Sequence, residues 1–227
     1  MPRHPALPRR LVTAFLVLLV GGCATAPGVP TVPPSTPAAA AEPIAGPQGD
    51  GRVLGSAAAP VMIIEFTDLQ CPYCARFARD TWPRIRKEYV ETGKVRFATR
   101  DLPLPFHDFA VPAAVAARCA GAQGKYWEYR EALFAAQSTL GSEPYGRLAA
   151  GLGLDATRFA ACRADPATLE SVRADAALAA ANGISGTPTF VIGRVVAGEF
   201  TGEVVSGAET FEAFAPRIEA LLKAAQH

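Results

Sequence analysis

A Cys-x-x-Cys motif stands where a buried strand passes directly into a helix, and this placement limits the folds open to the chain. Residues 61–66 form a short, mostly apolar run, which is typical of a strand covered on both faces. The motif Cys71-Pro72-Tyr73-Cys74 follows, and apolar residues then recur at three- and four-residue spacing as far as Tyr89, which predicts an amphipathic helix. Pro83 is expected to kink this helix. The motif is therefore expected at a helix N-terminus.

The position of the two cysteines favours redox chemistry. Unpaired N–H groups and the positive end of the dipole at a helix N-terminus stabilise a thiolate, which is the form that attacks a disulfide. Two intervening residues let the second thiol reach the resulting mixed disulfide, and Pro72 suits the first helical turn because it has no N–H group. A structural disulfide or half of a zinc site is the alternative. We expect no metal, because the other candidate ligands are isolated or terminal: Cys119, Cys162, His4 and His227.

The remaining pattern predicts an α/β fold with a mixed central sheet. Residues 94–100 alternate like a second strand, so strand, helix and strand make a parallel crossover unit. Residues 110–182 are rich in alanine and contain helix-like runs without a convincing strand. Strand character returns in residues 189–192 and 195–197, with Gly193-Arg194 as the predicted hairpin turn, before a final amphipathic helix. We therefore expect a helical insertion between the crossover unit and an antiparallel hairpin.

The N-terminus has the layout of an export signal. Residues 1–22 carry arginines, then an apolar run too short to span a bilayer, then small residues. The end of this segment resembles the bacterial lipoprotein processing box, so Cys23 is predicted to carry a lipid; an ordinary signal with a chance cysteine is the alternative. Ala24 weakly favours the outer membrane where a cell has two. We therefore expect a chain tethered in the bacterial cell envelope, facing the periplasm or the cell exterior.

A linker separates the predicted anchor from a single domain. Residues 23–50 hold seven prolines and almost no large apolar residue, so they are expected to stay solvated. Residues 51–227 then form the domain, with the helical insertion at about residues 108–183. The linker leaves no dimerisation domain, and we expect a monomer. With 22 basic and 21 acidic residues, the chain has no charge excess that would attract nucleic acid.

A Thr-Pro pair near the C-terminal hairpin completes the pattern. Gly186-Thr187-Pro188-Thr189 precedes the first hairpin strand, where a proline is tolerated and a cis bond would be a deliberate feature. The order of cysteine motif, helical insertion and Thr-Pro pair resembles the DsbA family of thioredoxin-fold thiol-disulfide oxidoreductases, over about residues 51–222. The resemblance implies a thioredoxin-like fold with an inserted all-helical subdomain.

The resemblance also assigns roles to individual residues. Cys71 matches the exposed nucleophile of that family and Cys74 its buried resolving cysteine. Pro188 matches the cis-proline that faces the disulfide, and Thr187 offers backbone groups on which an extended substrate could pair. Glu65 matches the family's buried acid, whose pKa should be raised in an apolar strand and which could exchange a proton with Cys74. A strand-end acid that reaches solvent is the alternative.

The dipeptide inside the motif bears on oxidising strength. Pro72-Tyr73 replaces the Pro-His pair of the strongest oxidants of the family, and tyrosine cannot supply the histidine cation that would stabilise the Cys71 thiolate. We therefore expect an intermediate reduction potential. The same dipeptide occurs in glutaredoxin-like sites, but the insertion and the export signal argue against that family.

Four residues outside the motif complete the predictions. Cys119 and Cys162 remain after the anchor and the active pair are assigned, exported proteins rarely keep idle thiols, and some members of the resembled group carry a second bridge. We therefore expect a disulfide inside the insertion; two buried free cysteines are the alternative. His107 is expected to be a hydrogen-bonded structural residue, and Asp68 a turn former.

The expected activity follows from the resemblance. The oxidised cysteine pair would accept electrons from cysteines of exported proteins, without a cofactor, and a membrane redox partner would reoxidise it. Two alternatives stay open. One is a reductase that uses the same site in the opposite direction, and the other is a tethered chaperone or binding lipoprotein whose cysteine pair is structural.

Overall fold

The computed structural model describes residue 46, residues 51–196 and residues 199–226. The predicted signal peptide, Cys23 and nearly all of the predicted linker lie outside these residues, so those features stay predictions. Within the described residues, no helix combines the length and the apolar character that crossing a membrane requires.

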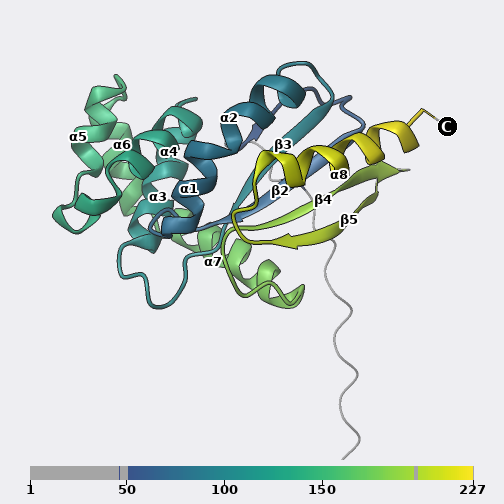
Figure 1. Cartoon of the computed structure of the whole chain (residues 1–227). Helices are drawn as coiled ribbons and strands as arrows, with labels where there is room; N and C mark the ends of the chain where they lie inside the picture. Colours follow the sequence, from purple (N-terminus) through teal and green to yellow (C-terminus); the bar gives the residue numbers. More distant parts are fainter. Residues whose placement is uncertain (1–45, 47–50, 197–198, 227) are drawn as a thin grey trace, which may run out of the picture. The chain divides into compact units, whose positions relative to one another are not determined.

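A five-stranded mixed sheet forms the centre of the described domain (Figure 1). Its strands are β1 Val53–Leu54, β2 Val61–Thr67, β3 Val95–Asp101, β4 Thr189–Val196 and β5 Glu199–Ser206. They lie in the order β1–β3–β2–β4–β5, with β2 and β3 parallel and the other neighbours antiparallel. This arrangement confirms the predicted parallel unit and the late antiparallel hairpin. β1 is too short to show in the sequence pattern.

The predicted hairpin turn lies inside a strand. Gly193 and Arg194, the predicted turn, lie inside β4, where Gly193 pairs with Gly202 of β5. The two backbones approach so closely that a Cβ built on Gly193 would lie 1.9 Å from the carbonyl oxygen of Thr201. The prediction was wrong because Gly193 is required for this close approach of two strands, not for a turn.

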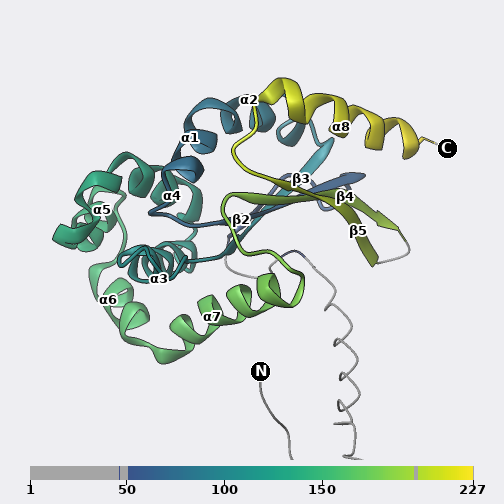
Figure 2. The ribbon, with the colours of Figure 1, turned by 60° about the horizontal axis from the view of Figure 1, so that its bottom comes forward.

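Helices cover both faces of the sheet. They are α1 Pro72–Asp80, α2 Trp82–Ile85, α3 Ala110–Gly121, α4 Tyr126–Ala135, α5 Tyr145–Gly151, α6 Ala156–Ala164, α7 Pro166–Ala181 and α8 Phe211–Ala224, with a π-helical turn η1 at Arg86–Val90 and a 3₁₀ turn η2 at Gln137–Ser142. Figures 1 and 2 show α1, α2 and α8 on one face and α7 on the other. Alternate residues of β2 therefore serve two cores: Ile63 packs in the core that includes Phe214 of α8, and Ile64 in the core that includes Ala179 of α7.

The first predicted helix is interrupted, as its proline indicates. α1 ends at Asp80, α2 begins at Trp82, and η1 continues to Val90. Pro83 lies in the first turn of α2, where its missing N–H group leaves no interior hydrogen bond unmade. The helix is interrupted at Thr81, two residues before the proline.

Helices α3 to α7 form the predicted insertion between β3 and β4. Buried ion pairs tie them to the sheet: Arg118 of α3 donates to Asp101 of β3 and to Asp175 of α7, each at 2.6 Å. Arg52, directly before β1, donates to Asp175 at 2.5 Å. Breaking such a buried pair is costly, so the insertion is held in one position on the sheet.

Candidate redox-active site

The end of β2 and the start of β4 bring the cysteine motif and the Thr-Pro pair together. Phe66 of β2 pairs with Thr189 of β4, so Thr187 and Pro188 lie beside the loop that leads to Cys71. The Thr187–Pro188 peptide bond is cis. Sγ of Cys71 lies 3.5 Å from the carbonyl oxygen of Thr187, although 116 residues separate the two along the chain.

Cys71 is an acidic thiol at the start of a helix. It is the N-cap residue of α1, and Pro72 takes the first helical position. The pKa of the Cys71 thiol is lowered to about 5, chiefly by a hydrogen bond from the Cys74 thiol and further by the Thr187 side chain and the N–H groups of Cys74 and Tyr73, while burial opposes the shift. Cys71 is therefore a thiolate at neutral pH.

Cys71 is less accessible than the resemblance implies. Only 3 % of its surface is exposed, so the expectation of an exposed nucleophile is wrong for this structure. The Thr187 carbonyl lies against its sulfur. Behind the cysteine loop, the side-chain amide of Gln137 donates to the carbonyl oxygens of Leu69 and Cys71, at 3.1 and 3.0 Å. The nucleophile thus lies in a contact between the cysteine loop and the cis-proline loop.

Cys74 is the more deeply buried and the less acidic of the two thiols. It has no exposed surface, and both cysteines are free in the structure. Burial raises the pKa of Cys74 well above its ordinary value, and the hydrogen bond to Cys71 and the negative charges of Glu65 and Cys71 add to the rise. The opposite shifts give one thiolate and one thiol at neutral pH, the pairing that a nucleophile and a resolving cysteine require.

Glu65 lies inside the protein and pairs with an arginine. Its side chain is fully buried, which excludes the alternative of a strand-end acid that reaches solvent. Nη2 of Arg130, on α4, lies 2.8 and 3.1 Å from the two carboxylate oxygens. Burial raises the pKa of the Glu65 carboxyl, and the Arg130 charge opposes part of that rise. Burial and the Arg130 charge thus act on the Glu65 carboxyl in opposite directions.

Asp68 and His107 fix the loop that carries the cysteines. The Asp68 carboxylate accepts hydrogen bonds from the N–H groups of Gln70 and Leu104, at 2.7 and 2.8 Å. Nδ1 of His107 lies 2.8 Å from the same carboxylate. The Asp68 N–H group points at the sulfur of Cys74, 3.5 Å away. Asp68 thus holds the turn, and His107 is one of its hydrogen-bond partners.

Tyr73 acts on Cys71 through its backbone N–H group. Its side chain is 57 % exposed, and the guanidinium carbon of Arg76 lies 5.1 Å from the centre of its ring. The Tyr73 N–H group helps to lower the pKa of Cys71. The phenol brings no positive charge to the sulfur, which agrees with the reasoning from the dipeptide.

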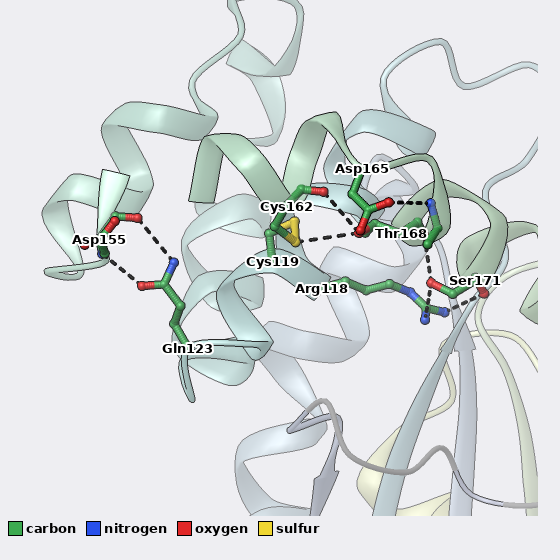
Figure 3. The surroundings of a disulfide bond; sticks show 9 residues. Arg118, Cys119, Gln123, Asp155, Cys162, Asp165, Thr168 and Ser171 are labelled. Atoms are coloured by element: carbon green, nitrogen blue, oxygen red, sulfur yellow. Dashed lines mark hydrogen bonds between the residues drawn. A yellow bond between two sulfur atoms is a disulfide. The ribbon is translucent and has the colours of Figure 1, made fainter. Parts of the chain in front are cut away.

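Cys119 and Cys162 form a disulfide inside the insertion (Figure 3). The 2.03 Å bond joins α3 to α6 across a sequence separation of 43 residues. Next to it, the Thr168 hydroxyl donates to the Cys162 carbonyl at 3.0 Å, and Arg118 donates to the Ser171 hydroxyl at 2.9 Å. None of these residues belongs to the Cys71–Cys74 site.

The sequence analysis did not predict two candidate functional residues, Gln137 and Arg130. Gln137 leaves no pattern, because an amide in a short turn has many roles. Arg130 does leave a signal: it shares the buried side of α4 with Tyr126, Trp127 and Leu133, at helical spacing. A charged residue on an apolar helix face needs a buried partner of opposite charge. That requirement points to an acid such as Glu65 but does not identify it.

Comparison with known proteins assigns the chain to a family. The thioredoxin family model matches residues 48–219. The chain belongs to the thioredoxin family. Alpha-DsbA1 from Wolbachia pipientis is a similar solved structure, at 26 % identity and a TM-score of 0.70, with 79 % of this chain and 94 % of that chain covered. A thioredoxin-like oxidoreductase from Silicibacter pomeroyi is similar at 27 % identity and a TM-score of 0.62, covering 75 % and 91 %. The described domain is a DsbA-like thiol-disulfide oxidoreductase domain.

Thioredoxin-family domains like this one also match parts of larger proteins. The Na(+)/H(+) antiporter NhaA 3 from Salinispora tropica is 37 % identical over 159 residues, which cover 69 % of this chain and 24 % of the antiporter. The chain thus spans about a quarter of the length of this curated relative. Antiport by the whole relative therefore does not carry over to the matched segment.

Proposed function

We propose that the protein oxidises cysteines of exported proteins in the bacterial cell envelope through the Cys71–Cys74 pair. The single observation that carries this proposal is that the pKa values of the two thiols are shifted in opposite directions. The pKa of Cys71 is lowered to about 5, and that of Cys74 is raised. A stabilised Cys71 thiolate favours the reduced form of the pair. The disulfide form then accepts electrons readily, which supports the oxidising direction.

The proposed cycle begins with a substrate thiolate. It attacks the Cys71 sulfur of the Cys71–Cys74 disulfide, and Cys74 leaves as a thiolate that takes a proton from Glu65. A second substrate thiolate then attacks the substrate sulfur of the mixed disulfide, and Cys71 leaves as the stabilised thiolate. Two electrons pass from the substrate to the cysteine pair. A membrane redox partner must take them up again to restore the disulfide.

The cis-proline loop is the proposed substrate platform. The Thr187 carbonyl oxygen lies 3.5 Å from the Cys71 sulfur, and Pro188 connects Thr187 to the start of β4. A substrate segment in extended conformation could pair with backbone groups of this loop and present its sulfur to Cys71. We infer that the envelope location comes from the predicted signal peptide and from a lipid on Cys23.

A reductase remains the competing function, because the same two thiols run the reaction in either direction. The redox state of the pair in growing cells separates the two. We expect the pair to be mainly oxidised when cells are quenched with acid and alkylated with a maleimide that adds mass to each free thiol. A pair that is mainly reduced at steady state would contradict the oxidase and favour the reductase.

Trapped adducts supply the control for this test. The Cys74→Ser variant keeps the nucleophile but lacks the thiol that resolves a mixed disulfide from within the protein. Mixed disulfides that form when Cys71 attacks a disulfide of an exported protein should therefore last longer and accumulate as adducts. The matched Cys71→Ser, Cys74→Ser variant should accumulate none. Adducts that persist without Cys71 would mean that another cysteine is the nucleophile.

A further inference from the structure

The helical insertion places a fully buried positive charge next to the thioredoxin-like core. Arg130 of α4 has no exposed surface, and its Nη2 atom donates to both oxygens of Glu65. Its Nε and Nη1 atoms find no hydrogen-bond partner among the described residues. The guanidinium carbon lies 4.8 Å from the ring centre of Phe134 and 5.6 Å from that of Trp127. The Glu65 carboxylate is thus the acid with which this cation forms an ion pair.

Glu65 receives no comparable charge from the sheet itself. Its register partners are Thr99 on β3 and Phe190 on β4, both uncharged. The charged groups that act on its carboxyl are Arg130 on α4 and Cys71 at the start of α1, and the Glu65 charge acts in turn on Cys74. Its register partner Thr99 is hydrogen-bonded to the Tyr126 hydroxyl. Of these charged groups, Arg130 alone is a cation. Its charge favours the ionised carboxylate, while burial and the Cys71 thiolate favour the protonated acid.

We propose that Arg130 is a positioning residue for disulfide exchange, whose charge keeps Glu65 able to accept the proton of Cys74. The inference rests on the proposed function of Glu65 and assigns a part of the chemistry to the insertion. Without the charge, the buried carboxyl would stay protonated at neutral pH and could not act as a base.

The step that depends on Arg130 is the closing of the Cys71–Cys74 disulfide. Once Cys71 carries a mixed disulfide, the Cys74 thiol gives its proton to the Glu65 carboxylate. The Cys74 thiolate then attacks the Cys71 sulfur, the Cys71–Cys74 bond forms, and the other thiolate leaves. An oxidase uses this step during its own reoxidation, and a reductase uses it on its substrate. The inference therefore does not depend on the direction of electron flow.

The step can be followed with 5,5′-dithiobis(2-nitrobenzoate) on the reduced full-length chain. Cys71 attacks the reagent and releases one chromogenic thiolate, and the closing of the disulfide releases a second one in a unimolecular step. Cys23→Ser is included in every variant, so that its thiol adds no signal. The rate of the second release is measured against pH by stopped flow.

Arg130→Met should slow the second release at pH 7 by about tenfold and move the pH at which the rate rises upward by about one unit or more, because an opposite charge near a carboxyl typically shifts its pKa by one to three units. Arg130→Lys keeps the charge and should stay within about threefold of the parent. The first release, which reports Cys71, should change little in both variants. If Arg130→Met does not fold, Arg130→Gln carries the same test with a neutral hydrogen-bond donor.

Glu65→Gln separates the inference from the proposed function on which it rests. It should slow the second release, and adding Arg130→Met to Glu65→Gln should not change the pH profile further. A slowed Glu65→Gln variant together with an unchanged profile in Arg130→Met would overturn the role of Arg130 and leave Glu65 in place. An unchanged rate in Glu65→Gln would overturn both.

Discussion

Replacing Cys71 by serine should lower the rate of disulfide exchange by at least about a thousandfold at pH 7, because a serine hydroxyl is not ionised there and cannot form the mixed disulfide. The Cys71 sulfur is the atom that lies against Thr187 of the cis-proline loop, and it is the more acidic of the two thiols. The rate of oxidation of a dithiol peptide by the disulfide form, or of reduction of insulin in the reverse direction, measures the loss.

Cys74→Ser is the matched control for this substitution. It removes the resolving thiol but leaves the nucleophile, so 5,5′-dithiobis(2-nitrobenzoate) should still release one chromogenic thiolate per chain and only the second release should be lost. Cys71→Ser should lose both rapid releases. A Cys71→Ser chain that keeps a tenth of the parent rate would show that the catalytic sulfur has been assigned to the wrong cysteine.

Removing the Cys119–Cys162 bridge should be the largest stability change that spares the active site. The bridge closes a loop of 43 residues, and the loss of that constraint on the unfolded chain is expected to lower the free energy of unfolding by about 4 kcal/mol. Cys119→Ala, Cys162→Ala and the double variant should lose similar amounts, because each breaks the same bond. Urea unfolding, with the Cys71–Cys74 pair fully reduced in every sample, measures the difference.

The redox site supplies the control for the bridge variants. In the part of the chain that the structure describes, the hydrogen bonds around the disulfide do not include Cys71 or Cys74, so the first release of chromogenic thiolate should keep its rate while the protein is folded. A stability loss below about 1 kcal/mol, far under the range for native bridges, would contradict the expectation. Two extra free thiols in the unfolded, unreduced parent would contradict the bridge itself.

The elements that the sequence predicts are those whose signal is local. Three features of the sequence depend only on neighbours within a few residues: the apolar run that becomes β2, the helical spacing after Cys74, and the breaks between α3 and α7. The prediction of a turn at Gly193-Arg194 was wrong because the structure there depends on a distant strand. Gly193 permits either a turn or the close approach of two strands, and only the register with β5 decides between them. β1, with two residues, has no period to detect.

The residue types of the site can be predicted from the sequence, but the surroundings of those residues in the fold cannot. The helix start after β2 is enough to expect an acidic Cys71. Its small exposed fraction depends on the Thr187 carbonyl, 116 residues away, and no local pattern reports that contact. The partner of Glu65 cannot be predicted from local sequence either. A buried arginine on α4 requires an acid, but the packing of the insertion on the sheet determines which acid it meets.

Cys71 should be ionised at neutral pH because of its surroundings, and a direct titration of the reduced full-length chain tests this expectation. The rate of alkylation by iodoacetamide and the thiolate absorbance are followed from pH 3 to pH 10, with mass spectrometry to identify the alkylated cysteine. Cys71 should titrate with a pKa of about 5. A Cys71 that titrates near the value of free cysteine, about 8.5, in a folded protein would contradict it.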